Sequence, residues 1–228
     1  MEEKKGEIIL VNKPYRWTSF DVVSKIRNLS KMKKVGHSGT LDPLATGLLV
    51  ICTGMYTKTI DTIQGKEKEY FGSLVLGATT PSYDLETEVD NRYPTEHITE
   101  KMILDNCSLF TGRIQQVAPA HSAKKINGKR AYELAREGLE VIIQPREVEI
   151  TVFEIIKIEM PRVDFRVVCS KGTYIRSLAF DFGKSLGSGA YLSALLRSRI
   201  GEFKIEDAHT IDQLIDRYKG AANSEVTP

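Results

Sequence analysis

The sequence predicts an α+β fold built on a mixed or largely antiparallel sheet. Its 228 residues have ordinary globular composition, with 41% hydrophobic and 27% charged residues, which excludes wholesale disorder and a fibrous repeat. Segments with strand character and segments with helical spacing are interspersed, without the regular rhythm of a doubly wound parallel sheet. No linker long enough to divide the chain is visible, so we expect residues 1–228 to form a single domain.

The first third of the chain is typical of strand, helix and strand in turn. Residues 8–11 are a short apolar run shortly before a proline, which predicts a buried strand. Thr18 offers an N-cap for a helix whose apolar residues recur three residues apart. Residues 48–52 predict a second apolar strand. The buried positions predicted for the helix are Phe20, Val23, Ile26 and Leu29.

The middle of the chain predicts a strand, a helix and a second strand. Residues 71–76 have extended character, and residues 99–111 have helical spacing that Gly112 ends. Residues 148–159 are rich in β-branched side chains, and their alternation changes near Phe153, which predicts a long strand with a bulge. The buried positions predicted for the helix are Met102, Ile103, Leu109 and Phe110.

The last third contains the clearest strand and the clearest helix. Apolar residues alternate with other residues between positions 163 and 169, so one face of this strand is predicted to be buried. The helix that follows begins near Thr173, carries one apolar stripe and ends at Gly187. The stripe consists of Ile175, Leu178, Ala179, Phe182 and Leu186.

Cysteine usage and hydropathy predict a soluble protein of the cytoplasm. Cys52, Cys107 and Cys169 lie far apart and form no CxxC pair, so neither a zinc ribbon nor a disulfide framework is indicated. The first residues are charged, and we expect no signal peptide. No apolar run approaches the roughly 18 residues that a membrane span needs, so we expect no membrane contact.

Charge is balanced overall but unevenly placed. Lys and Arg number 32 against 30 Asp and Glu, so the net charge of +2 cannot support nucleic-acid binding by itself. Residues 1–36, 121–138 and 162–176 are each basic, whereas residues 84–100 are strongly acidic. This polarity indicates one positive face built from three segments, although solvated charge without a partner explains it equally well.

The loop over residues 36–47 is the densest cluster of turn-forming residues. Its glycines allow the backbone to approach another molecule closely. Asp42 precedes a proline in this loop, and such an aspartate is either a turn former or a candidate catalytic carboxylate. His37 is more typical of a loop hydrogen-bond partner than of a base or ligand. The GxxG pattern at residues 36–39 is weak evidence for a KH nucleic-acid module.

Two further segments carry candidate binding residues. Tyr174 and Arg176 lie in the first turn of the last helix, where the positive end of the helix dipole disfavours an arginine. Either a carboxylate or a phosphate is therefore expected to compensate Arg176, and the alternative is a surface arginine. Residues 116–138 form a basic loop with Lys124 and Lys125, which is typical of a nucleic-acid clamp or of a solvent-facing hairpin.

Several short motifs occur in a fixed order along the chain. They are Asn12-Lys13-Pro14 with Thr18-Ser19, Gly36-His37-Ser38-Gly39-Thr40-Leu41-Asp42-Pro43, Tyr70, Ser122-Ala123, and Lys171-Gly172-Thr173-Tyr174-Ile175-Arg176. Together they resemble the TruB-type tRNA pseudouridine-55 synthases, from about residue 8 to residue 201. The resemblance implies the pseudouridine synthase fold, with a mixed, largely antiparallel sheet flanked by helices and an RNA-gripping thumb insertion at about residues 119–144.

The resemblance also implies an activity and a partner. The activity is isomerisation of a uridine in the TΨC loop of tRNA, uridine-55, without a metal or cofactor. The partner is the T stem-loop of tRNA, and no obligate protein partner is expected. Longer family members continue into a PUA RNA-binding domain, which we do not expect here.

Roles for individual residues follow from the same resemblance. Asp42 matches the catalytic aspartate, Arg176 the arginine that pairs with it, and Tyr70 the tyrosine packed on the target base. Two positions depart from the family pattern, because Arg16 stands where glycine is usual and His121 where tyrosine is frequent. The residues expected to line the site or bind RNA are Lys13, Pro14, His37, Tyr174, Leu195, Lys124 and Lys125.

The sequence leaves the chemical mechanism open. A carboxylate can act as a nucleophile at C1′ of the ribose or as a base at C2′. Two other functions also fit the fold: a non-catalytic RNA-binding or chaperone protein, and a guide-RNA-directed synthase of the dyskerin kind. The intact Asp42 and Arg176 argue against the first, and our expectation of no PUA domain argues against the second.

Overall fold

The computed structural model describes residues 6–122, 125–126, 129–130 and 143–224. The chain divides into two compact units, of which the first comprises residues 1–70 and 196–228 and the second residues 71–195. None of the helices in the described part of the chain combines the length and the hydrophobicity needed to span a bilayer.

The first unit contains a mixed sheet. β1 (Ile8–Lys13) pairs antiparallel with β3 (Thr46–Thr53), and β2 (Val35–His37) also pairs antiparallel with β3. β12 (Ala190–Ile200) pairs parallel with β3 at Leu196 and Arg197, and antiparallel with β13 (Phe203–Lys204). The single parallel pairing among these contacts makes the sheet mixed, as the sequence predicted.

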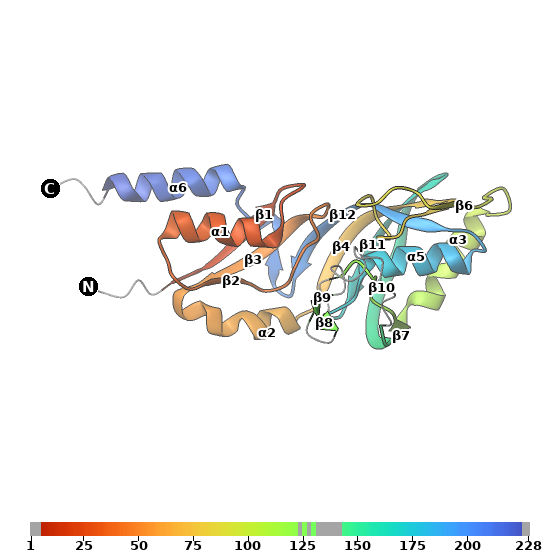
Figure 1. Ribbon diagram of the computed structural model, residues 1–228, viewed down its shortest axis with the longest axis horizontal. Helices are drawn as coiled ribbons and strands as arrows, with labels where there is room; N and C mark the ends of the chain where they lie inside the picture. The colour runs from red at the N-terminus through yellow and green to blue at the C-terminus, as the bar shows by residue number, and fades with distance from the viewer. Residues whose placement is uncertain (1–5, 123–124, 127–128, 131–142, 225–228) are drawn as a thin grey trace. The chain divides into compact units, whose positions relative to one another are not determined.

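Helices cover both faces of this sheet (Figure 1). α1 (Ser19–Ser30) and α6 (Ile211–Ser224) pack on one face, and α2 (Ile60–Gly65), which follows a 3-10 turn at Gly54–Thr59, packs on the other. A further 3-10 turn, Ile205–Asp207, precedes α6. The core under α1 and α6 consists of Ile9, Val11, Val22, Val23, Ile26, Leu49, Ile51 and Leu214, and the core under α2 consists of Leu48, Val50, Cys52, Ile63 and Ile200.

α1 begins where the sequence predicts, and of its four predicted core positions Val23 and Ile26 are buried and Leu29 packs against the core. Thr18 accepts a hydrogen bond from the Asp21 amide, and the Asp21 carboxylate accepts one from the Thr18 amide, which completes a capping box. The helix buries Val22, Val23 and Ile26. The prediction that Phe20 is buried is wrong, because that side chain is 67% exposed.

The second unit contains an antiparallel sheet. β4 (Lys68–Leu76) enters it from the first unit and neighbours β11 (Arg162–Cys169), which pairs antiparallel with β10 (Arg146–Glu159). β7 (Gly112–Gln116) pairs antiparallel with the other edge of β10. The register of β10 against β11 shifts on both sides of Phe153, so the predicted bulge is confirmed. The buried face of β11 is also confirmed, with Val163, Phe165, Val167 and Cys169 all inside.

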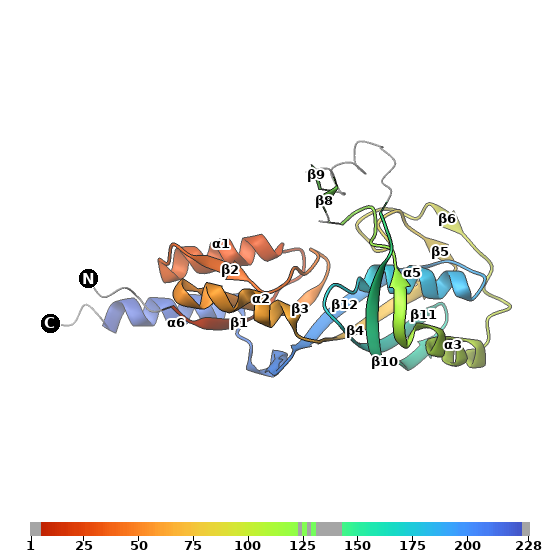
Figure 2. The same ribbon diagram turned by 90° about the horizontal axis from the view of Figure 1, so that it is seen from below.

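α5 (Ile175–Ser185) packs on this sheet and is seen behind β7 and β10 in Figure 2. Phe182 of α5 lies in an aromatic cluster with Phe110, Phe153 and Phe165. All the stripe residues predicted for this helix are buried.

The predicted helix over residues 99–111 is shorter than expected. α3 (Glu100–Asn106) ends early, and a 3-10 turn at Cys107–Phe110 follows it. Ile103 is buried as predicted, whereas Met102 and Leu109 are 39% and 65% exposed, so those two predictions are wrong. The early change to 3-10 geometry turns Leu109 away from the core face, whereas Phe110 packs against Phe153 and Phe182.

Four short strands complete the described part of the second unit. β5 and β6 form one antiparallel pair, and β8 and β9 form another inside the predicted thumb insertion. Most of that insertion, including Lys124, lies outside the described residues, as does the side chain of Lys125. The bounds of these strands are Ala78–Thr79, Asn91–Arg92, Lys125–Ile126 and Lys129–Arg130.

Candidate active site

Asp42 lies half-buried in the loop that joins β2 to β3 in the first unit. The Ala45 amide donates a hydrogen bond to the Asp42 carbonyl over 3.1 Å, which closes a tight turn. Gly47 follows with φ +100°, and a Cβ at this position would overlap the carbonyl oxygen of Arg197 on β12. The loop therefore requires glycine there, because L side chains rarely adopt this backbone conformation and no space is left for one.

Ser19, at the start of α1, holds the residue that precedes Asp42. Its hydroxyl donates to the Leu41 carbonyl over 3.1 Å and accepts from the Leu41 amide over 2.9 Å. Both backbone polar groups of Leu41 are thereby bound by one buried side chain. The N-terminus of α1 thus fixes the loop on one side of the carboxylate.

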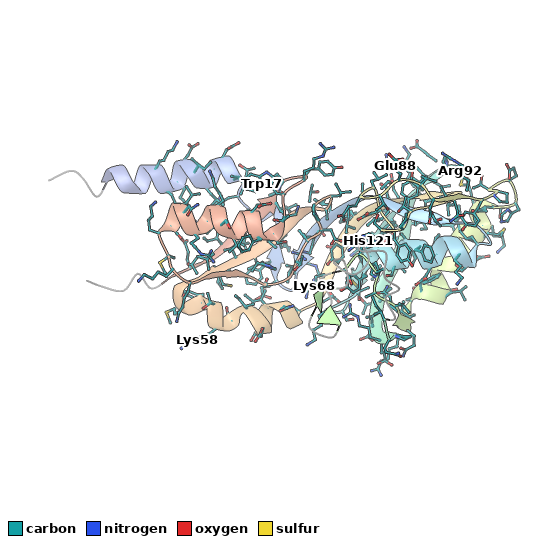
Figure 3. The ribbon with its side chains drawn as sticks, viewed as in Figure 1. Trp17, Lys58, Lys68, Glu88, Arg92 and His121 are labelled. Atoms are coloured by element: carbon teal, nitrogen blue, oxygen red, sulfur yellow. The ribbon has the colours of Figure 1, made fainter. Side chains whose placement is uncertain are left out.

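Lys13, at the end of β1, holds the other side of the loop. Its ammonium donates to the carbonyls of Pro14, Trp17 and Pro43 over 3.1, 2.6 and 3.4 Å. Trp17 is labelled in Figure 3. Burial lowers the pKa of Lys13 to about 8, against the opposing effect of the Asp42 charge. At neutral pH the ammonium is therefore mostly protonated, and its three protons match three carbonyls.

This placement specifies what Lys13 does in the structure. Its side chain is fully buried, and one of its three hydrogen bonds reaches the carbonyl of Pro43, next to Asp42. Contact with RNA, which the resemblance implied for Lys13, stays a prediction. The half-buried Pro14 directly follows Lys13 and supplies one of its acceptors.

Arg16 occupies the position where the family usually has glycine. It adopts the left-handed conformation, with φ +65°, and its amide donates to the Pro43 carbonyl over 2.8 Å. The chain therefore keeps a turn of the kind that glycine permits, and a non-glycine residue carries its strain. This turn brings the segment after β1 against the residue that follows Asp42.

Arg197 on β12 is a buried charge beside the same loop. Its side chain is 1% exposed, and its guanidinium donates to the carbonyls of Leu48, Gly39 and Thr40 over 2.8, 3.1 and 3.4 Å. The sequence predicted Leu195, two residues earlier in the strand, as a site residue but not Arg197. Nothing in the sequence distinguishes Arg197 from a surface arginine, because Ser198 and Arg199 follow it in the same strand.

His37 ends β2 and lies at the start of the same loop. The Gly39 amide donates to its Nδ1 over 3.2 Å, so the neutral ring carries its proton on Nε2. Burial, and then the charge of Arg197, lower the pKa of His37. His37 is thus the hydrogen-bond partner within the loop that the sequence suggested, and it is neutral at pH 7.

In the second unit, Arg176 is buried and faces a carboxylate. Its Nε lies 3.7 Å from Oδ2 of Asp84, and both side chains are almost fully buried. Its Nη1 donates to the carbonyls of Ser82 and His121, each over 3.1 Å; His121 is labelled in Figure 3. The prediction that a negative group compensates this arginine is confirmed, and the surface alternative is wrong.

Asp84 is held by a turn of polar residues. Its Oδ1 accepts a hydrogen bond from the Glu86 amide over 2.9 Å. The hydroxyls of Thr80 and Ser82 donate to its backbone carbonyl over 2.7 and 3.2 Å. In the sequence Asp84 was only one member of an acidic segment, and nothing in its spacing distinguished it. The predicted pairing of Arg176 with Asp42 stays a prediction, because the two residues belong to different units.

Tyr174 caps α5 and is held by Gln116 of β7. The Gln116 side chain accepts from the Tyr174 amide over 2.7 Å and donates to the Tyr174 carbonyl over 3.0 Å. The Arg146 guanidinium lies 4.8 Å from the centre of the Tyr174 ring, within the range of a cation–π contact. The first turn of α5 is therefore fixed through its backbone and through its aromatic ring.

Gln116→Leu is expected to lower the free energy of unfolding by about 1–3 kcal/mol, because it leaves the half-buried amide of Tyr174 without its acceptor. The Tyr174 carbonyl still accepts a hydrogen bond from the Leu178 amide. Urea unfolding measures the change. Gln115→Leu is the matched control, since Gln115 is the exposed neighbour on the same strand. Equal stability of the two variants would contradict the role of Gln116.

The remaining predicted residues are placed as follows. Tyr70 is buried in β4 at the end of the first unit, and Leu195 is half-buried in β12 at the end of the second. Both have interactions within the protein, and their contacts with a target base stay predictions. Within the described residues, no group of three or more His, Cys, Asp and Glu side chains is placed to hold a metal ion.

Comparison with known proteins identifies a family. A family model described as TruB family pseudouridylate synthase (N terminal domain) matches residues 27–175. The tRNA pseudouridine synthase B of Flavobacterium johnsoniae is 51% identical over 214 residues, which cover 91% of this chain and 93% of that protein. The tRNA pseudouridine synthase B of Phocaeicola vulgatus is 50% identical over 218 residues, which cover 93% of each chain.

A solved structure shares the fold. It is titled "Crystal Structure of a Cbf5-Nop10-Gar1 Complex", and the matching chain is 30% identical with a TM-score of 0.76. The match covers 98% of this chain and 57% of that one, so this chain spans a little over half its length. The likeness confirms the predicted fold class.

Proposed function

The chain belongs to the TruB family of pseudouridylate synthases, and we propose that it isomerises uridine-55 in the TΨC loop of tRNA to pseudouridine. Relatives that are about half identical over almost the whole chain are tRNA pseudouridine synthases, which supports tRNA as the substrate. The T stem-loop is the part of tRNA that carries this uridine and that the site would contact.

The immobilised loop of Asp42 is the observation that carries this proposal. Ser19, Lys13 and Arg197 come from α1, β1 and β12, and all three bind backbone groups within six residues of Asp42. Asp42 is itself only half-buried, whereas the side chains that hold its loop are buried. A fixed carboxylate that solvent can reach is what attack on a ribose carbon or a ribose proton requires.

The isomerisation is balanced without any added reactant. The bond from C1′ to N1 breaks, the uracil turns, and C1′ bonds to C5, which loses its proton while N1 gains one. We propose that Asp42 begins the reaction either as a nucleophile at C1′ or as a base at C2′. Both routes need an ionised carboxylate, which is the ordinary state of an aspartate at neutral pH.

The target base must leave its stack before the carboxylate can reach the ribose. Enzymes that modify a base usually flip the nucleotide out and stack it on an aromatic side chain. We propose Tyr70 and Tyr174 for this role; the ring of Tyr174 is already oriented by Arg146. Leu195 would add an apolar contact, and Lys124 and Lys125 would bind phosphates of the stem.

The test is conversion of a single uridine in a defined RNA. The protein is incubated with a tRNA transcript, and pseudouridine is mapped by carbodiimide modification and primer extension. We expect one new stop at position 55, and none in a matched transcript with cytidine at that position. A folded protein that leaves uridine-55 unmodified, or that modifies another site instead, would refute the proposal.

A further inference from the structure

Arg197 is a buried cation that donates its hydrogen bonds to uncharged acceptors. Moving a guanidinium from water into a protein interior is expensive unless good acceptors or an opposite charge compensate it. In the described part of the chain, the acceptors of its hydrogen bonds are backbone carbonyls, which carry no net charge. Lys13 and His37 lie close enough for the Arg197 charge to lower the pKa of each. An apolar side chain of similar size would avoid this repulsion.

The acceptors of Arg197 lie on both sides of Asp42 in the chain. Gly39 and Thr40 precede Asp42 in the loop, and Leu48 follows it in β3. The backbone of Arg197 is also in register with Gly47 across the parallel pair of β12 and β3. One planar guanidinium therefore binds both arms of the loop that presents the carboxylate.

Arg199, two residues further along β12, shows the ordinary arrangement of an arginine on this strand. Its side chain is 26% exposed and lies 2.9 Å from a carboxylate oxygen of Glu67 and 3.6 Å from one of Glu69. Such an arginine is compensated by opposite charge, and its partners are Glu67, Glu69 and the carbonyl of Gly201. The difference between Arg197 and Arg199 is what a role in the reaction would produce.

We propose that Arg197 is a positioning residue of the isomerisation, which fixes the direction of the Asp42 carboxylate by binding the backbone on both sides of it. This inference rests on the proposed function and adds a residue to its site. Arg197 acts through the loop and does not touch the RNA, since its side chain is fully buried.

A lysine cannot reproduce this arrangement. Its ammonium is a point charge on a flexible stem, whereas the guanidinium presents donors in a rigid plane that can reach three separate carbonyls. Arg197→Lys keeps the charge and loses the geometry. Arg197→Met keeps the approximate volume and removes both the charge and the donors.

The experiment compares these two variants with Arg199→Lys and Arg199→Met. For each protein, the melting temperature, the Kd for tRNA and the single-turnover rate at saturating tRNA are measured below the melting transition. We expect both Arg197 variants to bind tRNA within about threefold of the parent and to react at least about 30-fold more slowly. The Arg199 variants are expected to react within about threefold of the parent.

Three results would overturn the inference. Folded Arg197 variants that react within about threefold of the parent would show that the residue only supports stability. A rate that is slow at low tRNA concentration but equal to that of the parent at saturating tRNA would show that Arg197 contributes to RNA binding. Loss of folding in both Arg197 variants, but not in the Arg199 variants, would make its role purely structural. An inactive parent protein would refute the proposed function instead, so the two failures are distinguishable.

Discussion

Asp42→Asn is expected to abolish pseudouridine formation, with a loss of at least about a thousandfold in the single-turnover rate, or about 4 kcal/mol in the activation barrier. The amide keeps the size and shape of the side chain. It has no negative charge, so it can neither attack C1′ nor remove a proton from C2′ at a useful rate. Rates are measured with excess enzyme and saturating tRNA.

The structure predicts that this variant remains folded and binds tRNA. The contacts that hold the loop are made by Ser19, Lys13 and Arg197 to backbone groups, and the substitution leaves those groups in place. Asp61→Asn is the matched control, because Asp61 is an exposed aspartate of α2 in the same unit. A rate for Asp42→Asn within about tenfold of the parent would remove Asp42 from the mechanism.

Features that depend on neighbours in sequence could be predicted. The N-cap at Thr18 and the apolar stripe of α5 both follow from short spacings, and the structure confirms them. The bulge in β10 was visible because a β-bulge changes the alternation of apolar residues within one strand. The Asp42 loop was found because its turn-forming residues are consecutive.

Features that depend on distant partners could not be predicted. Arg197 binds the Gly39 carbonyl, which is 158 residues away in the sequence. Without knowledge of that partner, an arginine in a strand is predicted to be a surface charge. Asp84 has the same limitation, because only the fold places it beside Arg176. The prediction that Phe20 is buried was wrong for a different reason. Apolar residues lie on two adjacent faces of α1, and the face that contains Val22 is the one that packs against β1 and β3.

Arg176→Lys is expected to slow the reaction by at least about a hundredfold at saturating tRNA, close to 2.7 kcal/mol in the barrier. The guanidinium donates to the carbonyls of Ser82 and His121 while it faces Asp84, and a lysine ammonium cannot keep this set of directions. Arg162→Lys is the matched control, since Arg162 is an exposed arginine of the same unit that pairs with Asp164. A near-normal rate for Arg176→Lys would show that Arg176 only stabilises the fold.

Asp84→Asn separates the structural part of this effect from the catalytic part. Removing one partner of a buried ion pair is strongly destabilising, so this variant is expected to lose about 3–5 kcal/mol of unfolding free energy. In a double-mutant cycle with Arg176→Lys, the stability losses should be less than additive, because the two side chains are in contact. If Arg176 serves the reaction directly, its substitution must still lower the rate in the Asp84→Asn background. If the double variant reacts as fast as Asp84→Asn alone, Arg176 contributes only through its pairing with Asp84.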